Sequence, residues 1–149
     1  MNLYKSISWT LVVVWMAIIF LLSSQVVEKS NDLSKGVTKI IVDTVEKVNP
    51  KANFNIRRFN HILRKNAHFF AYLILGILVI NALNASGKCG YKSVALTLFI
   101  CVLYAISDEV HQMFVPGRGP QIKDVFIDSA GTIVGILMYL IISPLVLKR

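Results

Sequence analysis

The sequence predicts an all-α membrane protein: a bundle of four transmembrane helices, with an amphipathic helix in the long first loop. The chain is 55% hydrophobic and has a mean hydropathy of +0.62. Only 16% of its residues are charged, whereas soluble domains carry about 25%. The apolar residues also gather in long runs, which indicates membrane spans rather than a soluble core. The length suits a single domain, residues 1–149.

Four apolar runs are expected to cross the membrane, at about residues 7–27, 67–86, 93–112 and 124–147. The first run follows Lys5 and carries no formal charge before Glu28. No A-x-A-like cleavage site follows it, so we expect a retained anchor rather than a cleaved signal peptide. The second run contains His68 but no Asp, Glu, Lys or Arg.

The uncharged part of the third run is too short to cross a bilayer. Residues 93–107 would reach only about 22 Å as a helix, whereas the bilayer core is about 30 Å thick. The helix must therefore continue to Gln112 in order to cross. This places Asp108, Glu109 and His111 at the end of a spanning helix and not in a loop.

The segment between the first two spans, residues 24–66, contains an amphipathic pattern. Its apolar residues recur at helical spacing, and its charged residues fall mostly on the opposite face. Asn49 and Pro50 would end this helix, which is expected to lie flat on the bilayer or to cap the bundle. The apolar positions are Leu33, Val37, Ile40, Ile41, Val45 and Val48.

Polar residues fall on single faces of the last three spans. On the fourth span, Asp124 and Asp128 share a face with Gly131 and Gly135, which form a G-x-x-x-G motif. Such a motif permits close approach of a neighbouring helix. The polar faces of the second and third spans carry Lys65, His68 and Tyr72, and Asp108, His111 and Gln112, respectively.

The topology of four spans brings these faces to one side of the membrane. The first and third spans end on that side, and the second and fourth begin there, so we expect one polar pocket. A Pro/Gly turn, residues 115–120, would hold Arg118 over its mouth. Ionisable groups at such depth normally face the bundle interior and pair with one another. The predicted ligand-binding residues are Lys65, His68, Tyr72, Asp108, Glu109, His111, Gln112, Arg118, Asp124 and Asp128.

The pocket has several possible uses that the sequence leaves open. It can be a structural network that locks the bundle, or a site that binds a lipid headgroup or the tail of an antibiotic. It can also be a metal site built on Asp108 and His111, although no H-E-x-x-H motif or cysteine pair is present. We expect neither a bound metal nor another cofactor.

The remaining alternative is a membrane-embedded hydrolase or transferase that acts on a lipid-linked phosphate. A histidine would act as general base beside an aspartate that orients it, and Lys65 and Arg118 would clamp the anion. No signature of a lipid phosphatase, alcohol phosphotransferase or hydrolase is present, so enzymatic activity stays an open question. The candidate catalytic residues are His68, His111, Asp108 and Asp128.

The net charge of +8 favours an anionic partner. Nucleic acid is not expected, because the chain has four spans and no base-reading module. An anionic lipid, or a lipid-linked component of the cell envelope, is the natural partner of a basic membrane protein.

Two segments resemble the VanZ-like family of bacterial membrane proteins. They are "LRKNAHFFAYLILG", residues 63–76, and "SDEVHQMFVPGRGPQIKDVFIDSAGTIVG", residues 107–135. The resemblance covers essentially the whole chain, although Ala71 stands where relatives often carry Glu before the Tyr. It implies a multi-pass protein of the bacterial cell membrane. It also implies a role in low-level resistance to teicoplanin and other lipoglycopeptides.

Overall fold

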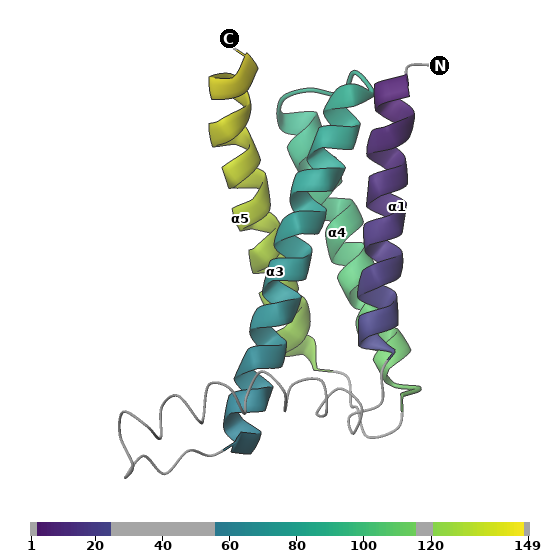
Figure 1. Ribbon diagram of the computed structural model, residues 1–149, viewed down its shortest axis with the longest axis vertical. Coiled ribbons are helices and arrows are strands. Elements are labelled where there is room, and N and C mark those ends of the chain that lie inside the picture. Colours follow the sequence, from purple (N-terminus) through teal and green to yellow (C-terminus); the bar gives the residue numbers. More distant parts are fainter. Residues whose placement is uncertain (1–2, 25–55, 116–120, 148–149) are drawn as a thin grey trace.

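The computed structural model describes residues 3–24, 56–115 and 121–147 and shows four long helices (Figure 1). They are α1 (Leu3–Ser23), α3 (Ile56–Ala85), α4 (Tyr91–Gln112) and α5 (Ile122–Leu147). The described part of the chain contains no strand. Each helix includes a stretch long and apolar enough to cross a membrane, namely Leu3–Ser23, Lys65–Ala85, Tyr91–Gln112 and Ile122–Ser143. The all-α fold class with four spanning helices is therefore confirmed.

The amphipathic helix predicted around Leu33 to Val48 lies outside the described residues, so it stays a prediction. The backbone of α3 is helical from Ile56 onward, well before its apolar stretch begins at Lys65. The second span is therefore continuous with a polar helical extension on its N-terminal side.

The helix α4 continues without a break to Gln112, as the short third run predicted. Asp108, Glu109 and Gln112 are all buried, and Asp108 is only 2% exposed. Met113 caps the C-terminal end of the helix, and its backbone N–H donates to the carbonyl of Val110. The acidic residues thus belong to the inner face of a spanning helix rather than to a loop.

A tight turn joins α3 to α4 and depends on two glycines. Gly87 has a φ of +82° and follows the end of α3. The N–H of Gly87 donates to the carbonyl of Asn84, and the N–H of Lys88 donates to that of Leu83. This is the Schellman arrangement, in which a residue with positive φ satisfies the last carbonyls of a helix. Gly90, with a φ of +69°, is the N-cap residue of α4, which begins at Tyr91.

The helix α3 is the centre of the bundle and contacts each of the other three helices (Figure 1). Its inner face supplies Tyr72, Leu75 and Val79 to the buried core, where Val12 of α1 and Cys101 of α4 pack against it. Within a bilayer such packing acts through close contact and not through exclusion of water. The fit between helices therefore decides the arrangement.

The helices α3 and α5 approach each other backbone to backbone at glycines. A Cβ atom on Gly131 would overlap the carbonyl of Phe69, and one on Gly135 would overlap the carbonyl of Leu73. A Cβ atom on Gly76 would lie 2.8 Å from the carbonyl oxygen of Thr132. The close approach expected from the G-x-x-x-G motif is therefore present, and it involves α3.

Two hydrogen bonds fasten α1 to the rest of the bundle near its middle. The indole N–H of Trp15 donates to the carbonyl of Ala71 over 2.9 Å. The hydroxyl of Tyr104 donates to the carbonyl of Met16 over 2.6 Å. Both carbonyls lie within helices, so these side chains add a second donor to groups that already accept a helical bond.

Replacing Tyr104 by Phe should therefore destabilise the bundle modestly. Hydrogen bonds between membrane helices contribute about 0.6–2 kcal/mol, because the freed groups find other partners. We expect a lower melting temperature in detergent, whereas Tyr91→Phe should have no effect because Tyr91 is 79% exposed. Equal melting temperatures for Tyr104→Phe and the wild type would contradict this role of the hydroxyl.

Candidate functional site

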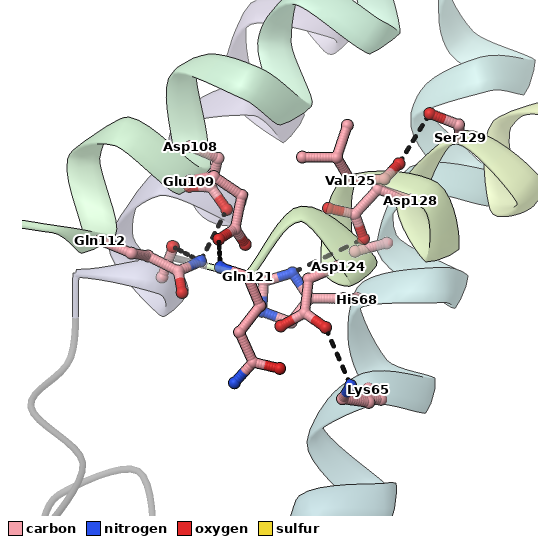
Figure 2. A network of polar contacts seen from close by, with 12 residues as sticks. Lys65, His68, Asp108, Glu109, Gln112, Gln121, Asp124, Val125, Asp128 and Ser129 are labelled. Atoms are coloured by element: carbon pink, nitrogen blue, oxygen red, sulfur yellow. Dashed lines mark hydrogen bonds and ion pairs between the residues drawn. The ribbon is translucent and has the colours of Figure 1, made fainter. Parts of the chain in front are cut away.

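Polar side chains from all four helices meet at one end of the bundle, where α1 and α4 end and α5 begins (Figures 1 and 2). We call this group the polar cluster. Most of its members belong to the site predicted from the sequence, and only Ser23 was not expected there. The polar cluster consists of Ser23, Lys65, His68, Tyr72, Asp108, Glu109, Gln112, Asp124 and Asp128.

The outermost pair of the polar cluster joins α3 to α5. The ammonium group of Lys65 lies 3.1 Å from Oδ1 of Asp124. Their side chains are 24% and 19% exposed, respectively, so the pair remains accessible from outside. Asp124 also lies in the first turn of α5, where a negative charge is favoured by the helix dipole.

A second pair lies one helical turn deeper on the same two helices. Nδ1 of His68 is 3.9 Å from Oδ1 of Asp128. This is ion-pair distance and too long for a hydrogen bond. Asp128 is completely buried, whereas the side chain of His68 keeps 19% of its surface exposed. A buried carboxylate is costly unless it is paired, and a protonated His68 would supply the opposite charge.

Asp108 connects the polar cluster to the end of α1 through Gln112. The side-chain amide of Gln112 donates to Oδ2 of Asp108 over 3.2 Å and to the hydroxyl of Ser23 over 2.9 Å. Asp108 and Gln112 are one turn apart on α4, so they share the face that points into the bundle. The other carboxylate oxygen of Asp108 accepts no hydrogen bond from the described residues.

Glu109 has a defined structural contact at the start of α5. One of its carboxylate oxygens accepts the backbone N–H of Gln121 over 2.7 Å (Figure 2). The first N–H groups of a helix have no partner within the helix, and a carboxylate satisfies them well. Glu109 therefore fixes the position of α5 against α4, and with it the placement of Asp124 and Asp128.

Tyr72 is a buried member of the polar cluster on α3. Its side chain is completely buried, and its hydroxyl has no hydrogen-bond partner among the described residues. It is close enough to Asp108 and Asp128 for both charges to act on it. Its ring centroid is 6.1 Å from that of Tyr104. The inner end of the polar cluster is thus bounded by aromatic rings.

The described part of the polar cluster carries an excess of negative charge. It contains four carboxyl groups, which face one lysine and one histidine. Asp128 is near enough to Asp108, Glu109 and Asp124 for their charges to repel one another. The four carboxylates come from α4 and α5 and converge on one region, as Figure 2 shows.

Among the predicted site residues that the structure describes, His111 is not joined to this network. The ring of His111 packs against Phe20, with centroids 4.3 Å apart, although its buried Nε2 has no hydrogen-bond partner among the described residues. Arg118 and the turn that was expected to hold it lie outside the described residues. A role for either in ligand binding stays a prediction.

The metal-site alternative has no geometric support in residues 3–24, 56–115 and 121–147. No group of three or more His, Cys, Asp or Glu side chains is arranged there to hold a metal ion. Asp108 and His111 share a helix, but the ring of His111 lies against Phe20 instead of completing a ligand set with Asp108.

The sequence interpretation missed a second polar network, at the opposite end of the bundle. The hydroxyl of Tyr4 donates to the amide oxygen of Asn81, and the amide of Asn81 donates to the hydroxyl of Ser8. The amide of Asn84 donates to the hydroxyl of Tyr139. All these groups are neutral. Asn81 and Asn84, three residues apart in an apolar run, were the available signal for a shared polar face.

Comparison with known proteins agrees with this architecture. A family model described as VanZ/LLP1 matches residues 8–143, a stretch that includes all four described helices in large part and the whole polar cluster. No curated protein and no solved structure matches the chain. The chain is a membrane-helix bundle and belongs to the VanZ/LLP1 family.

Proposed function

We propose that this protein is a multi-pass protein of a bacterial cell membrane and that its polar cluster binds the headgroup of an anionic lipid or lipid-linked envelope component. One observation carries the proposal: buried polar atoms of the cluster are left without hydrogen bonds by the described residues. They are Oδ1 of Asp108, Oδ2 of Asp128 and the hydroxyl of Tyr72.

A purely structural network would leave fewer such atoms. Most buried polar groups in proteins are hydrogen-bonded, and an unsatisfied group costs about 1–3 kcal/mol. Within a membrane, ionisable residues usually mark a path or site for a polar ligand. Three unsatisfied groups within one polar cluster are thus better explained by a ligand that supplies their partners.

Lys65 provides the contact for the anionic part of the headgroup. An ammonium group has three N–H donors, and the contact with Asp124 uses one of them. The side chain is partly exposed at the outer edge of the polar cluster, so the remaining donors can reach a phosphate oxygen. The net charge of +8 further attracts anionic lipid to the protein.

Replacing Lys65 by Gln should weaken binding of phosphatidylglycerol about tenfold, which is the loss expected for one charge-assisted hydrogen bond. Binding can be measured by native mass spectrometry of the purified protein titrated with the lipid. Lys92→Gln is the matched control, because Lys92 is exposed at the far end of α4. Equal loss in both variants would show a general effect of charge, and no loss in either would refute the proposed contact.

We further propose that headgroup binding underlies low-level resistance to teicoplanin and other lipoglycopeptides, as the family resemblance implies. Expression in a susceptible Gram-positive host should raise the minimum inhibitory concentration of teicoplanin. Lys65→Gln and Arg118→Gln should abolish that increase while immunoblots show normal protein levels in the membrane. Resistance that survives both changes would argue against this role.

The pairing of His68 with Asp128 favours an enzyme as the second candidate function. A neutral His68 can act as a general base, and Asp128 would orient its ring once the 3.9 Å gap between Nδ1 and Oδ1 tightens to a hydrogen bond when substrate binds. The reaction would be hydrolysis or transfer at a lipid-linked phosphate held by Lys65. Incubation with headgroup-labelled phospholipid should then release label, and His68→Gln should stop the release. If no label is released from any phospholipid, headgroup binding without catalysis remains as the proposed function.

A further inference from the structure

We infer that the phosphate headgroup taken by the polar cluster is zwitterionic rather than net anionic: it also carries a protonated amine, and Asp108 and Asp128 bind this ammonium group. The inference rests on the proposed headgroup function and specifies its chemistry. A phosphate group alone explains the contact proposed for Lys65. It does not suit the surroundings of Asp108 and Asp128, the buried part of the polar cluster.

The arrangement of charge shows why an anion does not fit there. Asp108 is 2% exposed and Asp128 is completely buried, and the two come from different helices, α4 and α5. They are near enough for their charges to repel each other. A second anion placed beside them would add to this repulsion, whereas a cation between them would remove it.

The unused hydrogen-bonding atoms point to a donor with several N–H groups. Oδ1 of Asp108 and Oδ2 of Asp128 accept no hydrogen bond from the described residues, although both residues are buried. A primary ammonium group offers three donors and can bond to both carboxylates at once. A hydroxyl group of a sugar or glycerol offers one donor and could satisfy only one of them.

The aromatic residues beside the aspartates suit the same ligand. Tyr72 lies within electrostatic reach of both aspartates, and Tyr104 within reach of Asp108. The two rings are 6.1 Å apart. A desolvated ammonium group is attracted by the face of a tyrosine ring, and the hydroxyl of Tyr72 can accept a further N–H bond. These features do not help to bind a phosphate.

The spacing along the axis of α5 allows one headgroup to contact Lys65 with its phosphate and Asp128 with its amine. Asp124, the partner of Lys65, and Asp128 are separated by four residues of α5, or about 6 Å. A phosphate beside Lys65 and an amine beside Asp128 would thus be joined by a linker of two or three carbon atoms. An amino-alcohol phosphate ester has this form.

The test compares lipids that share their acyl chains and differ only in the headgroup. The purified full-length protein is titrated in detergent with phosphatidylethanolamine, phosphatidylcholine and phosphatidylglycerol, and binding is measured by native mass spectrometry. Phosphatidylethanolamine should bind at least about tenfold more tightly than the other two. Phosphatidylcholine has a positive charge but no N–H donor, so it separates hydrogen bonding from charge alone.

Variants of Asp108 and Asp128 test whether these residues cause the preference for phosphatidylethanolamine. Asp108→Asn and Asp128→Asn should each reduce the preference for phosphatidylethanolamine over phosphatidylglycerol to about twofold or less, whereas Asp108→Glu should keep a clear preference. Ser107→Ala is the matched control, since Ser107 is exposed beside Asp108. If the Asn variants do not fold, the comparison of the three lipids on the wild type still decides the question.

The possible results separate this inference from the proposed function. Phosphatidylglycerol binding as tightly as phosphatidylethanolamine would overturn the ammonium site and leave headgroup binding intact. Unchanged preference in both Asn variants would likewise overturn it, because the aspartates would then be neutral structural groups. Failure of all three lipids to bind would refute headgroup binding, and the inference would fall with it.

Discussion

Replacing Gly135 by Ala should lower the stability of the bundle by about 1–3 kcal/mol, the usual cost of overpacking a close contact. The added methyl group would overlap the backbone carbonyl of Leu73, which cannot rotate away as a side chain can. The helices α3 and α5 would have to move apart along their shared length. Gly131→Ala should behave in the same way, because its methyl group would meet the carbonyl of Phe69.

Whether Gly135→Ala raises or lowers stability tests the close contact between α3 and α5. In an open helical position, Gly→Ala stabilises by up to about 1 kcal/mol, so only a real steric conflict makes it destabilising. Unfolding in detergent provides the measurement, and Val134→Ile is the control because it adds one carbon at a position that is 37% exposed. A raised melting temperature for Gly135→Ala would show that the two backbones are not in close contact.

Replacing His68 by Leu should cost about 1–3 kcal/mol, the usual penalty for leaving a buried polar group without its partner. Asp128 would keep its position in the interior but lose its histidine partner. A buried carboxylate without a partner must either stay charged at high cost or take up a proton. Phe70→Leu is a suitable control, because Phe70 lies on the same helix and is 59% exposed.

Adding Asp128→Asn to His68→Leu should recover most of this stability. The second change removes the charge that the first leaves unpaired, so the two effects should be strongly non-additive. Asp128→Asn alone should cost less than His68→Leu, because His68 is partly exposed and water can solvate its ring. Additive losses in the double variant would show that His68 and Asp128 do not act as a pair.

The spans and the membership of much of the polar cluster could be predicted from local features of the sequence. Runs of apolar residues have the length of a bilayer whatever surrounds them, so four spanning helices follow from composition alone. The short third run likewise required Asp108 and Glu109 to lie within a helix, and α4 does extend to Gln112. Because successive spans run in opposite directions, the polar ends of the second, third and fourth spans then fall on one side.

The partners within the polar cluster could not be predicted in this way. Helical periodicity states which residues share a face, but not how each helix is rotated or shifted against its neighbour. His111 fell on the same face as Asp108 in the sequence, yet its ring packs on Phe20. Ser23 carried no signal, because one serine after an apolar run is ordinary, and only the approach of α1 to α4 gives it a bond to Gln112.

The sequence by itself thus determined the number of spans, the gathering of the ionisable residues at one and the same side of the membrane, and the motif at which helices come close. The tertiary structure decided the rest: the pairs Lys65–Asp124 and His68–Asp128, the contact of Glu109 with the start of α5, and the unsatisfied oxygens of Asp108 and Asp128. The reason is physical. Length and hydropathy are properties of each segment, whereas a contact depends on the relative position of two helices, which close packing at Gly131 and Gly135 sets.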